Sequence, residues 1–100
     1  MDKYGVKLMS RAVRDLDGIY DYIANTLLEP GTALNMVERI ENAILSLETM
    51  PYRCLERKWG SYANRGYRQL FVENYTAVFR IDEVKKMVIV VTVRYSPSEF

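Results

Sequence analysis

The sequence predicts an α+β fold with one twisted sheet: an N-terminal strand, an antiparallel helix hairpin, and then a three-stranded antiparallel meander. Two patterns carry this prediction. Between residues 10 and 50, apolar side chains recur every three or four positions on two stretches separated by Pro30-Gly31, which is the spacing of amphipathic helices. Between residues 67 and 95, apolar and polar side chains alternate between short polar turns, which is the spacing of strands.

The first half of the chain is expected to hold one strand and two helices. Residues 3–9 alternate loosely, as in a short strand, and Ser10 can then act as the N-cap of the first helix. Thr32 can cap the second helix, which Met50-Pro51 ends. The side chains expected to face the core are Ala12, Leu16, Ile19, Ile23 and Leu27 in the first helix, and Ala33, Val37, Ile40, Ile44 and Leu47 in the second.

The second half is expected to begin with a loop and to continue as strands. Residues 51–66 show no period, and we expect an ordered loop held by Tyr52, Leu55 and Trp59. Strands follow at residues 67–72, 75–82 and 87–95. Glu73-Asn74 is expected to form a tight turn, because asparagine tolerates a positive φ.

Alternation along the last two strands predicts which side chains meet the helices. The expected helix-facing set is Tyr75, Ala77, Phe79 and Ile81, followed by Met87, Ile89, Val91, Val93 and Tyr95. The opposite face then presents Arg80 and Arg94, and arginines on an uncovered sheet face suggest a binding surface. The alternative is that these arginines pair with Asp82 or Glu99 and only solubilise the face.

Composition limits the classes of protein and of chemistry. One hundred residues suffice for one domain, residues 1–100, and no apolar run reaches the length of a bilayer span. No signal peptide is evident and Cys54 is the only cysteine, so we expect a cytoplasmic protein with an inert thiol and no membrane partner. The absence of histidine excludes Ser-His-Asp and Cys-His catalysis, and we expect no metal and no cofactor. Asp15, Asp17 and Asp21 are expected on a solvated helix face.

The net charge of +1 conceals an uneven distribution. Residues 1–52 carry five basic and eight acidic side chains (5 − 8 = −3), whereas residues 53–80 carry six basic and two acidic ones (6 − 2 = +4). A basic segment suggests an anionic partner, either nucleic acid or an acidic protein. The candidate contacts are Arg53, Arg57, Lys58 and Arg65. The alternative is a solvated loop that is basic without a partner.

Four stretches, taken in order, resemble the RelE/ParE superfamily of toxins. They are residues 10–24, which end in Tyr22-Ile23-Ala24; residues 40–51 with their terminal proline; residues 66–70 followed by 74–82; and residues 91–95. The resemblance covers nearly the whole chain and implies the fold predicted above. It also implies the toxin half of a bacterial type II toxin–antitoxin system. Such a toxin is neutralised by a cognate antitoxin, commonly acidic and partly disordered.

The resemblance implies one of two targets. RelE-like members cut messenger RNA on the ribosome without a metal, whereas ParE-like members inhibit DNA gyrase. For a nuclease, arginines would stabilise the phosphate and another side chain would move protons; the candidates are Arg68, Arg80, Arg94 and Tyr95. RelE-like nucleases have an arginine where this chain has Thr76, and a histidine base is missing, so the ParE-like mechanism is favoured. A non-toxic member that keeps only antitoxin binding is the third hypothesis.

Overall fold

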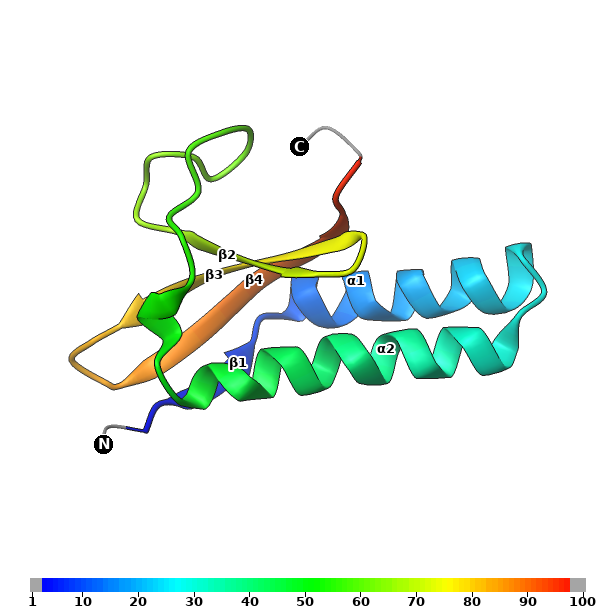
Figure 1. Ribbon diagram of the computed structural model, residues 1–100, viewed down its shortest axis with the longest axis horizontal. Coiled ribbons are helices and arrows are strands. Elements are labelled where there is room, and N and C mark those ends of the chain that lie inside the picture. The colour runs from blue at the N-terminus through cyan, green and yellow to red at the C-terminus, as the bar shows by residue number, and fades with distance from the viewer. Residues whose placement is uncertain (1–2, 98–100) are drawn as a thin grey trace.

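The computed structural model describes residues 3–97 and has the predicted α+β architecture (Figure 1). Its elements are β1 (Gly5–Leu8), α1 (Ser10–Asp21), a π-helical turn (Tyr22–Thr26), α2 (Pro30–Leu45), two 3₁₀ turns (Ser46–Glu48 and Pro51–Arg53), β2 (Arg68–Val72), β3 (Tyr75–Asp82) and β4 (Met87–Tyr95). The strand order is β1-β4-β3-β2, with β1 parallel to β4 and the other pairs antiparallel. The helix hairpin covers one face of this sheet. No helix in the described part is both long and apolar enough to cross a bilayer.

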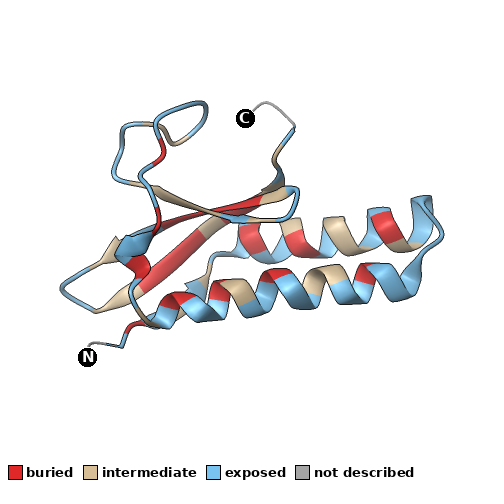
Figure 2. Ribbon diagram, in the orientation of Figure 1, coloured by how far each residue is buried: buried red, intermediate tan, exposed pale blue. Residues whose placement is uncertain are grey.

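The core lies between the helix hairpin and the covered face of the sheet, where the buried segments of both layers face each other (Figure 2). Its main members are Ala12, Leu16, Ile40, Ile44, Leu47, Ala77, Phe79, Val88, Val90 and Val93. Most of the predicted helix stripe is therefore confirmed. Leu27 and Val37 are exceptions, because Leu27 is 52% exposed and Val37 is only partly buried and lies outside the core cluster.

A β-bulge in β4 reverses part of the predicted alternation. Val78 pairs with Thr92 but its neighbour Phe79 pairs with Val90, so β4 carries one extra residue. Because cross-strand partners share a face, Val88 and Val90 join the core. The prediction that Met87, Ile89 and Val91 meet the helices as one alternating set is wrong for this reason, whereas Val93 beyond the bulge is a core residue as predicted.

The helix starts and one turn also differ from the prediction. Ser10 is the first residue of α1 and Met9 precedes it as the N-cap, with no side-chain capping hydrogen bond. Pro30 opens α2, where its fixed φ suits the first turn, so Thr32 lies inside the helix. At the β2–β3 turn the positive φ of 53° belongs to Glu73 and not to the following asparagine.

A carboxylate at the β3–β4 turn joins three parts of the chain. Glu83 accepts hydrogen bonds from the hydroxyls of Tyr4, at 2.9 Å, and Tyr52, at 2.6 Å, and it forms a salt bridge with Lys86. These contacts stabilise the ionised carboxylate, Lys86 contributing most, and they lower the pKa of Glu83 from 4.5 to about 2. The cluster fixes the start of the 51–67 loop to the sheet.

Glu83→Gln is expected to reduce stability at neutral pH and to make the urea midpoint of unfolding less dependent on pH in the acidic range. The pKa of Glu83 is lower in the folded protein, so its contribution is complete above its ordinary pKa of 4.5 and is lost as the pH falls from 4.5 towards 2. Urea unfolding of both proteins at pH 7 and pH 2.5 measures this. The difference between them should shrink at the lower pH. Glu41→Gln on the exposed side of α2 is the control, and an equal effect there would contradict the assignment.

Candidate functional site

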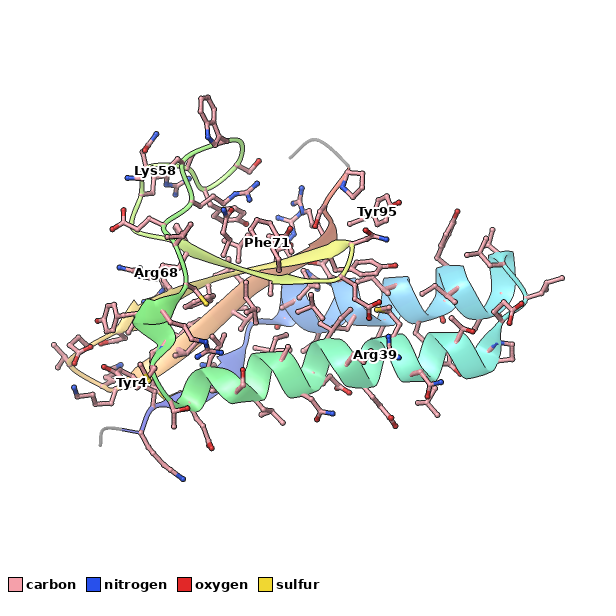
Figure 3. All side chains as sticks on the ribbon, in the orientation of Figure 1. Tyr4, Arg39, Lys58, Arg68, Phe71 and Tyr95 are labelled. Carbon is pink, nitrogen blue, oxygen red and sulfur yellow. The ribbon has the colours of Figure 1, made fainter. Side chains whose placement is uncertain are left out.

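The loop between the second 3₁₀ turn and β2 is fixed at its base by Arg68. The Arg68 guanidinium donates a hydrogen bond of 2.6 Å to the carbonyl of Cys54 and lies 5.0 Å from the centre of the Tyr52 ring. It also forms a salt bridge of 3.7 Å with Glu56. Figure 3 shows Arg68 at this end of the sheet, below the loop that carries Lys58. Arg68, which was predicted as a candidate catalytic residue, therefore has a structural role in holding the loop.

Arg57 is buried within the loop and connects its two sides by hydrogen bonds. Its side chain is only 8% exposed, and it donates to the carbonyl of Ser61 at 2.6 Å and to the Gln69 side chain at 3.0 Å. Burial, and to a smaller extent the charge of Arg94, lower the pKa of the Arg57 guanidinium. The loop is ordered, as predicted, but its anchors are Arg57 and the buried Cys54.

The predicted anchors of this loop are on the surface. Trp59 is 84% exposed, Leu55 is 74% exposed and Tyr52 is 49% exposed. Tyr52 still contributes through its hydrogen bond to Glu83, whereas no hydrogen bond or ring contact within residues 3–97 involves the side chains of Leu55 and Trp59. The prediction failed because an apolar side chain in a loop has no periodic pattern that distinguishes core from surface.

The four predicted target-binding residues separate into two pairs. Arg53 donates to the carbonyl of Thr49 at 2.8 Å, and it is engaged with its own chain in the same way as Arg57. Lys58 and Arg65 are displayed on the surface. Lys58 pairs with Glu56 at 3.7 Å, and the Arg65 guanidinium lies 5.9 Å from the Tyr67 ring centre.

The four predicted nuclease residues do not lie together. Arg68 pairs with Phe79, whose side chain is in the core, so Arg68 is on the helix side of the sheet. Arg80 and Arg94 lie on the sheet face away from the helices, but Arg94 is opposite Thr76 and Arg80 is opposite Ile89. Four residues along β3 separate Thr76 from Arg80, so at about 3.3 Å per residue roughly 13 Å of strand separates the two arginines.

The sheet face away from the helices carries hydroxyl groups as well as arginines, and Thr76 and Thr92 on it are buried. The Thr76 and Ser96 hydroxyls lie 2.6 Å apart, and the Arg94 Nε donates to the Thr92 hydroxyl at 3.3 Å. Arg80 has no ion pair within residues 3–97, and Asp82 instead accepts from the backbone N–H of Lys85. The alternative partner considered for these arginines, Glu99, lies outside the described residues.

An apolar groove lies at the other end of the molecule, where α1 and the π-helical turn extend beside the ends of β3 and β4. Its volume is about 670 Å³, and residues that line it include Ile19, Tyr22, Ile23, Leu27, Tyr75 and Tyr95. Tyr75 and Tyr95 meet edge to face, with ring centres 5.6 Å apart. Tyr22, Leu27 and Tyr95 are each about half exposed, at 56%, 52% and 48%. Exposed apolar side chains gathered in a groove are typical of a protein-binding site.

The sequence held one indication of this groove. The apolar stripe of the first helix continues to Leu27, although the strands expected to cover it are short. Tyr95, chosen as a candidate for chemistry, lies in the groove together with Tyr22, which was noted only as part of the family resemblance. An apolar helix stripe that is longer than the sheet packed against it therefore indicates an apolar surface that the chain itself does not cover.

Asp15 closes the free edge of β4 beside the groove. β1 ends where Leu8 pairs with Val90, and the next part of β4 has no strand on that side. There the Asp15 carboxylate accepts hydrogen bonds from the Thr92 hydroxyl at 2.5 Å and from the backbone N–H of Val93 at 3.0 Å. The expectation of a solvated face is therefore wrong for Asp15. No group of three potential metal ligands occurs in the described part of the chain.

This fold is shared with proteins of known toxin–antitoxin systems. The chain is similar to a chain of the chromosomal ParDE toxin–antitoxin system from P. aeruginosa, with a TM-score of 0.77, 26% identity, and 93% and 96% of the two chains covered. It shares its fold with a chain of the RelBE2 toxin–antitoxin complex from Mycobacterium tuberculosis, with a TM-score of 0.63, 22% identity, and 95% and 93% of the two chains covered. A chain of the archaeal RelE–RelB complex from Pyrococcus horikoshii also has this fold, with a TM-score of 0.61, 13% identity, and 94% and 96% of the two chains covered. The RelE/ParE superfamily assignment is thus confirmed.

The family within this superfamily follows from the sequence. A family model described as the ParE toxin of the type II toxin–antitoxin system parDE matches residues 6–97. The chain therefore belongs to the ParE toxin family. No curated protein matches it.

Proposed function

We propose that this chain arrests bacterial growth by inhibiting DNA gyrase and that a cognate antitoxin neutralises it. The observation that carries the proposal is the match of the ParE toxin family over residues 6–97. The placement of the arginines supports the same choice, because the candidate nuclease residues Arg68, Arg80 and Arg94 lie on two faces and at two ends of the sheet. Cleavage of RNA needs charge stabilisation and proton transfer at one phosphate.

The antitoxin is proposed to bind in the apolar groove. The similar structures are described as ParDE and RelBE systems, in which a toxin is associated with its antitoxin. In this chain the groove has mostly apolar walls, and the exposed side chain of Arg14 is one of the residues that line it. An amphipathic, acidic segment that folds on binding fits these properties, with its apolar side in the groove and a carboxylate near Arg14.

Purified toxin, separated from its antitoxin, tests the proposed target. Micromolar toxin is expected to inhibit supercoiling by gyrase and to accumulate cleaved DNA, and added antitoxin should reverse both effects. Unchanged supercoiling and DNA cleavage would contradict the proposal. Induction of the toxin in cells without antitoxin distinguishes this proposal, which predicts growth arrest, from the hypothesis of a non-toxic family member, which predicts normal growth.

Arg80→Ala is expected to leave growth arrest unchanged within about twofold, because an exposed side chain with no ion pair among residues 3–97 contributes little to folding. Colony counts after induction measure arrest, and sequencing of messenger RNA ends shows whether messages are cut. A ribosome-dependent nuclease would instead leave cut messages in the arrested wild-type cells and would lose its activity in Arg80→Ala. Intact messages with retained arrest support the gyrase proposal.

A further inference from the structure

Trp59 is the most unusual surface residue of the chain. It is the only tryptophan, and 84% of it is exposed. Tryptophan is large and apolar, and in folded proteins it is normally well buried. The loop that carries it lies above β2, on the side of the sheet away from the helix hairpin (Figure 1).

The loop is held in one conformation by its own contacts. The backbone N–H of Asn64 donates to the carbonyl of Arg57 at 2.9 Å, and the Tyr62 and Tyr67 rings meet edge to face with centres 5.0 Å apart. Gly60 and Gly66 adopt positive φ values of 70° and 83°, which glycine permits without strain. A loop that is ordered before binding loses little conformational entropy when it binds.

The chemistry around Trp59 is that of a protein-recognition surface. Residues 57–66 contain three basic side chains and no acidic one, and the two that are exposed, Lys58 and Arg65, lie on either side of Trp59 in sequence. Tryptophan, tyrosine and arginine are the residues most enriched where a few side chains dominate a protein interface. Two exposed cations are few for a nucleic-acid site, which usually contacts many phosphates.

We propose that the loop 57–66 is the target-recognition element of this toxin. Trp59 enters an apolar pocket on an acidic protein surface, and Lys58 and Arg65 pair with carboxylates at the rim of that pocket. The antitoxin groove is built from α1, the π-helical turn and the ends of β3 and β4, so the two surfaces share no residue. The identity of the target, DNA gyrase, rests on the proposed function, whereas the role of the loop does not.

Trp59→Ala tests the role of the indole. Its side chain is exposed, so the far-ultraviolet spectrum and the urea midpoint should equal those of the wild type. Inhibition of gyrase is expected to need about 30-fold more toxin, the size of effect at dominant interface residues. Growth arrest should be lost, and antitoxin affinity should stay within about twofold. Lys58→Glu with Arg65→Glu should act in the same direction.

Two matched variants serve as controls. Trp59→Phe keeps an aromatic ring and should restore most of the inhibition, and a Trp59→Phe toxin as inactive as Trp59→Ala would contradict an aromatic contact in an apolar pocket. Leu55→Ala removes a comparably exposed apolar side chain just outside the loop and should inhibit gyrase like the wild type. Wild-type inhibition by Trp59→Ala would overturn the inference.

A label on the single tryptophan distinguishes the class of partner. In toxin made with 5-fluorotryptophan, the one fluorine resonance should broaden on addition of gyrase and should not move with antitoxin. A single-stranded 15-nucleotide DNA should leave it unchanged, and a shift with that DNA would replace the protein partner by nucleic acid and overturn the inference. If the wild type arrests growth without inhibiting gyrase, the proposed target is wrong, and loss of arrest in Trp59→Ala still supports the loop. A wild type that does not arrest growth overturns both.

Discussion

Leu27→Asp is expected to weaken antitoxin binding by about 30-fold or more, equivalent to about 2 kcal/mol, without unfolding the toxin. Leu27 lines the apolar groove but is half exposed, so the free protein can hydrate the new carboxylate. A bound antitoxin segment would cover that carboxylate without a partner, which is costly. Calorimetric titration of toxin with antitoxin measures the change, and in cells the variant should remain toxic when antitoxin is co-expressed.

Leu45→Asp is the matched control for this substitution. Leu45 is the last residue of α2, is exposed to a similar extent at 57%, and does not line the groove. Its replacement should leave the affinity for the antitoxin unchanged. Equal weakening by both variants would point to a general effect of charge, and no weakening by Leu27→Asp would place the antitoxin elsewhere.

The fold was predictable because strong periodic patterns determine it. The stripe from Ala33 to Leu47 is the pattern of a helix with one buried side, and every strand of the meander was correctly located to within one residue. Local exceptions were not predictable from these patterns. The bulge in β4 changes no residue type, because Val88 to Val91 are all β-branched and apolar and fit either face.

The candidate site was harder to predict. A cluster of charged residues in the sequence does not show which groups each side chain contacts in the fold. Arg68 and Arg57 belong to the same basic segment as Lys58, yet both are held by the chain's own carbonyl groups. These contacts depend on how an aperiodic loop closes, which no spacing rule describes. Trp59 illustrates the converse: it was expected to anchor the loop, and its exposure suggests a binding role instead.

Asp15→Ala is expected to destabilise the protein by about 2–3 kcal/mol, because one carboxylate oxygen satisfies two groups at the edge of the sheet. Thr92 is fully buried and Val93 is nearly so, so water cannot readily replace the lost acceptor. The backbone N–H of Val93 and the Thr92 hydroxyl would then both lack this partner. Urea unfolding measures the loss directly, as a lower midpoint at unchanged slope.

Two further substitutions separate this effect from the loss of a negative charge on α1. Asp15→Asn keeps an acceptor oxygen at the same position, so it should lose less stability than Asp15→Ala. Asp17→Ala removes an exposed carboxylate from the same helix and should change stability by no more than about 0.5 kcal/mol. Equal losses at Asp15 and Asp17 would mean that charge on the helix, and not closure of the β4 edge, is what matters. A selective loss at Asp15 would show that a helix carboxylate takes the place of the missing strand beside β4 and holds α1 against β4.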